Sequence, residues 1–257
     1  MKLFNHKSGE YIDIDSAKIY FEGIGNSKKH PLIFLHGGFG NMEDFNEIIP
    51  SIHNEYYIIG IDSRGQGKST LGNNKLTYER IQKDIQIVLE KLSITNPIII
   101  GFSDGGIAAL RLASFNKIKI DKLIIIGSSW HSKSLESSKD ILGGITAEKW
   151  KKRFPETFEK YQSLNPEPNF EKLTESIVKM WIDEEKTGRP NENIRNINCP
   201  TLIIRGDKDH LTSKRSVFEL SELIENTNLA NIPFSGHEVY VEQKNVVIEI
   251  INQFLKK

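Results

Sequence analysis

Short apolar runs and longer amphipathic stretches alternate along most of this chain. The apolar runs are rich in β-branched residues, so each is predicted to form a buried strand. These runs cover residues 32–35, 56–61, 97–100, 123–126, 201–205 and 229–232. Apolar side chains at helical spacing predict helices over residues 42–52, 77–92, 107–114, 213–224 and 244–255. Strands that alternate with helices in this way predict a parallel sheet covered by helices on both faces.

Two segments depart from this alternation. Residues 11–22 contain β-rich pairs of apolar residues, which predict a hairpin at the edge of the sheet. Residues 132–198 show no strand pattern and contain helical pieces at 146–154, 155–162 and 169–185. A segment of this length between two strands is rarely structureless in a compact domain. We therefore expect it to form a helical cap over the carboxyl ends of the strands.

A serine lies in the glycine-rich turn that follows the run at residues 97–100. Gly101 and Gly105 stand two residues before and two residues after Ser103, and a helical pattern follows at once. A side chain at either glycine would collide with the neighbouring strand or helix if the turn were sharp enough to strain Ser103. The following helix would direct its free N–H groups and the positive end of its dipole toward the serine hydroxyl. A G-x-S-x-G turn between a strand and a helix is typical of a nucleophilic serine.

With these flanking elements, the segment resembles the nucleophile elbow of α/β-hydrolase-fold proteins. Four loop motifs in the right order and a cap in the usual place extend the resemblance over nearly the whole chain. The G-F-S-D-G-G form resembles serine hydrolases of the biphenyl hydrolase-like, or carboxylesterase, branch. The resemblance implies an α/β-hydrolase fold with a mostly parallel central sheet, helices on both faces and a helical cap inserted between late strands. We expect the core at residues 1–131 and 199–257 and the cap at residues 132–198.

A serine nucleophile needs a base that removes its proton, and a histidine base needs a carboxylate that fixes its tautomer. In this fold the chain order is serine, acid, histidine. The sequence offers Ser103, then Asp207 or Asp209, then His237, each in a loop just after a predicted strand. His237 is the only histidine after the last predicted strand, and the resemblance favours the fourth position of the G-D-K-D motif as the acid. We predict a triad of Ser103, Asp209 and His237, with Asp207 as the alternative acid.

An oxyanion hole requires two backbone N–H groups aimed at the charge that develops on the substrate oxygen. One donor is expected from Asp104, the residue after the nucleophile. The other is expected from the glycine-rich loop at residues 36–40, at Gly38 or alternatively at Phe39. Glycine there would let the backbone approach the substrate closely. We expect His36 to brace this loop rather than to take part in the chemistry.

The candidates for substrate contact are mostly aromatic. Phe39, Trp130, Trp150 and Trp181 belong to this set, although the tryptophans could equally serve to pack the cap onto the core. Asp104 is a further candidate, because a carboxylate beside the nucleophile could bind a substrate ammonium. The branch named above includes esterases that act on amino-acid esters. The alternative for Asp104 is a solvated side chain that faces outward.

Residues 62–69, D-S-R-G-Q-G-K-S, match a D-x-R-G-x-G-x-S loop that is common in the resembled family. There the loop is a structural turn with internal hydrogen bonds. Its G-K-S tail also resembles a phosphate-binding P-loop. That motif needs a glycine where this chain has Asp62, and an aspartate would repel phosphate. We therefore predict a structural turn and no nucleotide site.

Composition argues against some classes of binding partner and bears on the cellular compartment of the protein. The 257 residues hold 34 Lys and Arg against 34 Asp and Glu, so no charge excess favours nucleic acid or an anionic membrane. The first residues lack the apolar run of a signal peptide, and no run approaches the ~20 residues of a membrane span. Cys199 is the single cysteine, and no Cys/His cluster indicates a metal. We expect a cytoplasmic protein without metal or cofactor whose partner is a small-molecule substrate; the sequence does not indicate an oligomeric state.

Together these features predict a serine hydrolase that cleaves a small to medium carboxylic ester through an acyl-enzyme. Dehalogenases and epoxide hydrolases of the resembled fold use an aspartate nucleophile, so Ser103 argues against both. Lactonase, thioesterase, carbon–carbon bond hydrolase, acyltransferase and cofactor-free haloperoxidase activities remain open, because fold alone does not fix the reaction. A receptor that binds a ligand in the same pocket without turnover is an alternative of another class.

Overall fold

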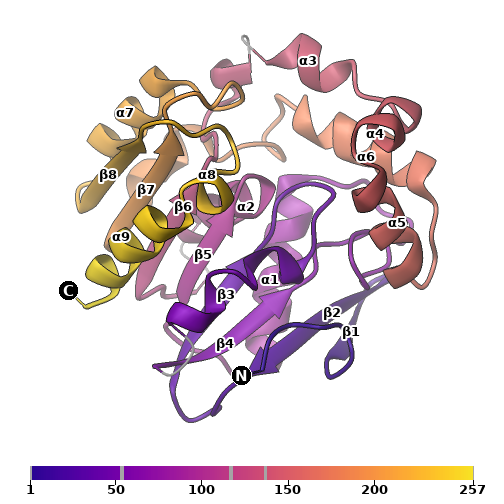
Figure 1. The fold of residues 1–257 in the computed structure, drawn as a ribbon, viewed down its shortest axis with the longest axis horizontal. Helices are drawn as coiled ribbons and strands as arrows, with labels where there is room; N and C mark the ends of the chain where they lie inside the picture. Colours follow the sequence, from indigo (N-terminus) through magenta and orange to yellow (C-terminus); the bar gives the residue numbers. More distant parts are fainter. Residues whose placement is uncertain (1, 53–54, 116–117, 136–137, 257) are drawn as a thin grey trace.

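The computed structural model describes residues 2–52, 55–115, 118–135 and 138–256. Its strands form one sheet in the order β1-β2-β4-β3-β5-β6-β7-β8 (Figure 1). The strands are β1 (Glu10–Ile14), β2 (Ala17–Ile24), β3 (His30–Leu35), β4 (Tyr56–Ile61), β5 (Ile98–Phe102), β6 (Lys122–Ile126), β7 (Thr201–Gly206) and β8 (Thr227–Ile232). The β1–β2 hairpin at the sheet edge is antiparallel, as is the pairing of β2 with β4, and the remaining pairs are parallel. The predicted mostly parallel sheet is confirmed.

Helices cover both faces of this sheet. One face packs against α1 (Tyr78–Lys91), α2 (Asp104–Ser114) and α7 (Lys214–Leu223), and the other packs against α8 (Val239–Glu242) and α9 (Lys244–Lys256). Neighbouring residues of one strand point to opposite faces of the sheet. In β3, Ile33 packs on the face covered by α1, α2 and α7, and Leu32 packs on the face covered by α8 and α9. A sheet buried on both faces needs strands that are apolar along their length, which is why these strands read as continuous apolar runs.

The described part of the segment between β6 and β7 contains helices joined by loops, and no strand. It contains η3 (Ser132–Leu135), α3 (Lys139–Gly143), α4 (Ala147–Arg153), α5 (Pro155–Leu164), α6 (Phe170–Trp181) and η4 (Asn191–Asn196). Helices α3 to α6 gather beyond one end of the sheet in Figure 1. The apolar stripe of α6 faces inward, since Phe170, Leu173, Ile177, Met180 and Trp181 are all buried. No helix among the described residues is both long and apolar enough to cross a membrane.

The prediction of one helix over residues 42–52 is wrong. This segment forms two separate 3-10 turns, η1 (Met42–Phe45) and η2 (Ile49–Ser51). Pro50, which lies inside η2, has no N–H to donate to the residue four positions earlier, so it disfavours one continuous α-helix over this segment. The apolar spacing still marks burial correctly, because Ile48, Ile49 and Ile52 all lie in the core.

Candidate active site

The turn between β5 and α2 holds Ser103 in a strained conformation. Its φ of 49° and ψ of −114° place a non-glycine residue at positive φ, where side chains are uncommon. The glycines around it permit this geometry: a Cβ on Gly105 would lie 2.1 Å from the Leu35 carbonyl oxygen of β3. A Cβ on Gly101 would lie 2.6 Å from the Gly105 carbonyl oxygen. The predicted collisions with a strand and a helix are therefore both present.

Three loops bring Ser103, His237 and Asp209 together. The Ser103 Oγ lies 3.0 Å from His237 Nε2, and His237 Nδ1 lies 3.0 Å from Asp209 Oδ2. The rival carboxylate of Asp207 instead accepts the backbone N–H of Ser235 at 3.3 Å. The acid that contacts the histidine is thus Asp209, the position that the G-D-K-D resemblance favoured.

The Asp209 carboxylate is surrounded by donors although its side chain is buried. Oδ1 accepts the backbone N–H groups of Leu211 at 2.8 Å and Thr212 at 3.0 Å, while Oδ2 faces His237. Burial alone would raise the pKa of Asp209, but the hydrogen bond and charge of His237, with the two backbone donors, lower it below its usual value. An ionised Asp209 fixes the Nδ1–H tautomer of His237 and leaves Nε2 free to accept the serine proton.

A cavity of about 1060 Å³ lies over these residues, between the strand ends and the cap. Ser103 and His237 line it from the core. The candidate contact residues on its wall are Phe39, Asp104, Trp150 and Trp181. The ring of Phe39 packs 4.0 Å from that of Trp150 between ring centroids, so the glycine-rich loop contacts the cap directly.

Trp130, the remaining aromatic candidate, does not line this cavity. Its indole Nε1–H donates to the backbone oxygen of Ser216 at 2.8 Å, in helix α7. The side chain is buried. Trp130 therefore ties the loop after β6 to α7. Its ring packs in the core, a position that gives no support to the predicted contact with substrate.

Asp104 is buried rather than solvated, so the outward-facing alternative is wrong. Its Oδ1 accepts the Tyr78 hydroxyl at 2.7 Å, and both carboxylate oxygens lie 2.8 Å from the Trp181 indole Nε1. Burial is the largest influence and raises the pKa of Asp104, which these donors and nearby Arg189 oppose. The carboxylate thus joins the elbow to cap helix α6. Its binding of a substrate ammonium stays a prediction.

The loop at residues 36–40 is braced as expected. His36 Nε2 accepts the backbone N–H of Ser63 at 2.9 Å, so Nδ1–H donates to the Gly37 carbonyl oxygen at 2.7 Å. Hydrogen bonds within the D-x-R-G-x-G-x-S loop stabilise its turn. Asp62 Oδ2 accepts the Lys68 backbone N–H, and the Ser69 hydroxyl donates to the Asp62 carbonyl. The prediction of a structural turn is therefore confirmed.

Several residues that support the site carried no signal in the sequence. Ser128 Oγ lies 2.9 Å from the Ser103 carbonyl oxygen, and Thr212 Oγ1 donates to the Gly127 carbonyl at 3.1 Å. Arg189 donates from Nε to Ser129 Oγ at 2.7 Å and from Nη1 to the Trp181 carbonyl at 3.0 Å. In the sequence, Tyr78 was only one residue of the helix predicted over residues 77–92. Within the described ranges, no cluster of three His, Cys, Asp or Glu side chains is arranged to hold a metal ion.

Comparisons with known proteins find relatives that match most of this chain. A protein of Haemophilus influenzae named "Putative esterase/lipase" is 29% identical over 241 residues, covering 88% of this chain and 83% of the relative. The serine hydrolase BPHL of Homo sapiens is 23% identical over 258 residues, covering 95% of this chain and 85% of the relative.

A solved structure and a family profile complete the comparison. The esterase EaEST of Exiguobacterium antarcticum superposes with a TM-score of 0.79 at 24% identity, covering 97% of this chain and 100% of that one, which shows a shared fold. The profile described as "alpha/beta hydrolase fold" matches residues 30–180. Because that match spans more than half of the chain, this protein belongs to the alpha/beta hydrolase fold family and is a hydrolase.

Proposed function

We propose that this protein is a serine esterase that cleaves small to medium carboxylic esters. The observation that carries the proposal is the continuous chain of contacts from Ser103 Oγ through His237 to Asp209, at the wall of a cavity. A cavity of about 1060 Å³, slightly above the roughly 300–1,000 Å³ that is common for ligand pockets, has room for a substrate of this size. The names of the relatives, which include an esterase/lipase and a serine hydrolase, support the same chemistry.

The first half of the reaction forms the acyl-enzyme. Ser103 Oγ attacks the ester carbonyl carbon while His237 Nε2 takes the hydroxyl proton. The resulting oxyanion is stabilised by backbone N–H groups of Asp104 and of Gly38 or Phe39. When the carbon–oxygen bond of the ester breaks, the His237 imidazolium returns its proton to the departing alcohol.

The second half releases the acid and restores the enzyme. Water attacks the Ser103 ester, and His237 Nε2 takes a proton from that water. The tetrahedral intermediate collapses, the bond to Ser103 Oγ breaks, and the proton on His237 passes to the serine oxygen. Asp209 keeps the imidazole in place and stabilises its positive charge in both halves.

An activity-based probe tests this proposal. A fluorophosphonate is expected to label Ser103, and Ser103→Ala is expected to abolish labelling and lower kcat for short-chain p-nitrophenyl esters by a factor on the order of 10⁶. Ser163→Ala, on the exposed face of α5, is the matched control and should keep both signals.

Two outcomes would contradict the esterase assignment. Labelling of Ser103 without turnover of a broad ester panel would favour a ligand receptor. Ester cleavage that persists in Ser103→Ala would place the nucleophile elsewhere. Thioesters and lactones belong in the same panel, because the same three side chains could process them.

A further inference from the structure

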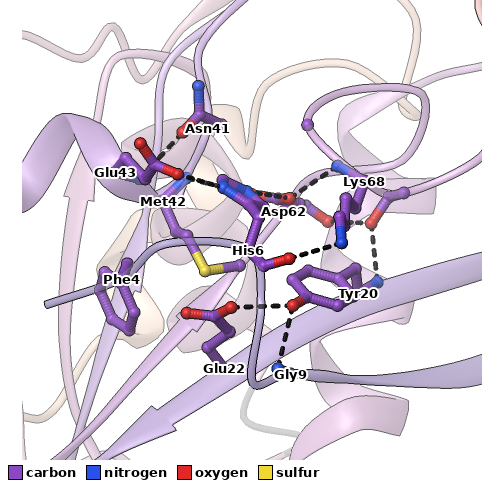
Figure 2. A network of polar contacts seen from close by, with 12 residues as sticks. Phe4, His6, Gly9, Tyr20, Glu22, Asn41, Met42, Glu43, Asp62 and Lys68 are labelled. Atoms are coloured by element: carbon purple, nitrogen blue, oxygen red, sulfur yellow. Dashed lines mark hydrogen bonds and ion pairs between the residues drawn. The ribbon is translucent and has the colours of Figure 1, made fainter. Parts of the chain in front are cut away.

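A buried histidine near the start of the chain joins two carboxylates beside the candidate site (Figure 2). His6 is 2% exposed; its Nδ1 lies 2.6 Å from Glu43 Oε1 and its Nε2 lies 2.8 Å from Asp62 Oδ2. An ionised carboxylate only accepts hydrogen bonds, so both ring nitrogens must donate. A histidine that donates from both nitrogens is an imidazolium, and the two contacts are charge-assisted hydrogen bonds.

The two carboxylates hold the segment that follows the glycine-rich loop. Asp62 Oδ1 accepts the backbone N–H of Met42 at 3.0 Å, and Met42 is the first residue of η1. Glu43 is the second residue of the same turn, which Asn41 caps through the N–H of Glu43. His6 therefore fixes η1 from two sides, directly after the loop at residues 36–40.

Glu43 extends this network to the cap. Its Oε2 accepts the ammonium of Lys160, in cap helix α5, at 2.8 Å. Glu43 and Lys160 both line the cavity that contains Ser103. The His6 charge thus acts on two parts of the cavity at once: the glycine-rich loop of the core and the edge of the cap.

The other charged and titratable groups around His6 come from β2 and from the D-x-R-G-x-G-x-S loop (Figure 2). The Tyr20 ring stacks on His6 at 5.6 Å between centroids, and its hydroxyl donates to Glu22. The Lys68 ammonium donates to the His6 backbone oxygen. Burial lowers the pKa of His6, but the hydrogen bonds and charges of Asp62 and Glu43 outweigh it, so the pKa rises above the ordinary 6.5.

We propose that the His6 imidazolium is a positioning residue for the ester-cleavage reaction, because it holds η1, the adjoining glycine-rich loop and cap residue Lys160 in one arrangement. The inference rests on the proposed function, since it acts through the loop expected to supply an oxyanion donor. Misplacing such a loop by a fraction of a bond length reduces transition-state stabilisation more than substrate binding.

The arrangement is expected to depend on pH in a defined direction. When pH rises through the raised pKa of His6, the ring loses one N–H donor, so either Glu43 or Asp62 loses its hydrogen bond from His6. The stability supplied by the pair is full below pH 6.5, the ordinary pKa, and is lost as pH rises through the raised value. Activity should therefore fall as His6 loses its proton on the alkaline side.

Two variants and a matched control test the inference. His6→Gln removes the titrating charge and is expected to lower kcat by about 10- to 100-fold, with a smaller change in KM, and to abolish the alkaline limb of the kcat profile. Glu43→Gln leaves His6 with one carboxylate, so the alkaline limb should move to lower pH. His30→Gln, at an exposed histidine paired with Asp121, should leave the profile unchanged.

A measurement independent of activity accompanies the kinetics. NMR titration of the His6 ring, assigned by comparison with His6→Gln, is expected to give a pKa above 6.5 that falls in Glu43→Gln. If His6→Gln does not fold, Glu43→Gln still carries the test, because Glu43 lies partly exposed at the cavity edge.

An alkaline limb that stays in place in Glu43→Gln, or a His6 pKa at or below 6.5, would overturn the inference. Absence of ester cleavage in the parent protein would instead count against the proposed function, and the NMR result would still stand.

Discussion

Asp209 shows how local contacts set the chemistry of a single residue. Its side chain is removed from solvent, which by itself favours the neutral acid. Two backbone N–H groups and the His237 ring reverse that preference and lower its pKa. Its contribution to folding stability is therefore present above the unfolded pKa of ~3.9 and is lost as pH falls through the lower folded value.

An amide in place of this carboxylate tests the role directly. Asp209→Asn keeps the side-chain size but removes the charge and can hold His237 in the wrong tautomer, so kcat for a p-nitrophenyl ester should fall by about 10⁴-fold. Asp207→Asn is the matched control, because that carboxylate accepts the Ser235 backbone N–H rather than facing His237, and its kcat should change little. Equal losses in the two variants would refute the assignment of Asp209 as the orienting acid.

The residues found from sequence are those that sit in ordered motifs. Ser103 and His237 stand in strand-end loops whose order along the chain is characteristic, so their meeting could be predicted. His6 and Tyr78 could not be found in this way. His6 meets Asp62 across 56 residues of sequence, and Tyr78 meets Asp104 across 26, in each case because two packed elements happen to adjoin.

At the scale of elements, the cap is attached to the core through polar and aromatic contacts near the nucleophile. Helix α6 brings Trp181 onto the Asp104 carboxylate, and α4 brings Trp150 onto Phe39. These contacts close one side of the cavity. The position of the cap thus sets the shape of the cavity, as well as covering the strand ends.

Replacing two tryptophans, one at the cavity and one away from it, tests whether an indole N–H group matters for substrate binding or only for stability. Trp181→Phe removes the donor to buried Asp104 and should lower the free energy of unfolding by about 1–3 kcal/mol and raise KM more than it lowers kcat. Trp130→Phe removes a comparable buried donor away from the cavity, so it should lose stability with little change in KM. Chemical denaturation and ester kinetics on both variants give the comparison; an equal rise in KM in the two would contradict it.

Most elements followed from periodicity, and the failures have physical causes. Helices α1 and α6 carry clear apolar stripes and polar N-cap residues, Thr77 and Asn169, so their starts lie within one residue of those predicted. The end of α6 was predicted at residue 185, but the helix ends at Trp181. Residues 42–52 had the same stripe, but they form two short 3-10 turns, the second of which contains Pro50. An apolar pattern reports which side is buried, whereas the hydrogen-bonding capacity of each residue decides the type of helix.

At the scale of the whole molecule, the parallel strands carry the active-site loops to one edge of the sheet. Ser103 follows β5, Asp209 follows β7 and His237 follows β8, and the cap inserted after β6 encloses them. Parallel strands end at the same edge, so side chains 134 residues apart reach hydrogen-bonding distance. The arrangement of the sheet could be predicted; the side-chain contacts that shape the cavity could not, because they depend on how the cap helices pack.

The central claim is that Ser103 becomes acylated during ester cleavage, and trapping the intermediate tests it most directly. The protein would be mixed with p-nitrophenyl acetate, quenched in acid before steady state, and mapped by peptide mass spectrometry. We expect a rapid release of about one p-nitrophenolate per protein and an acetyl group on Ser103. Ester consumption with acetyl on another residue, or with none after quenching at the burst, would contradict the account.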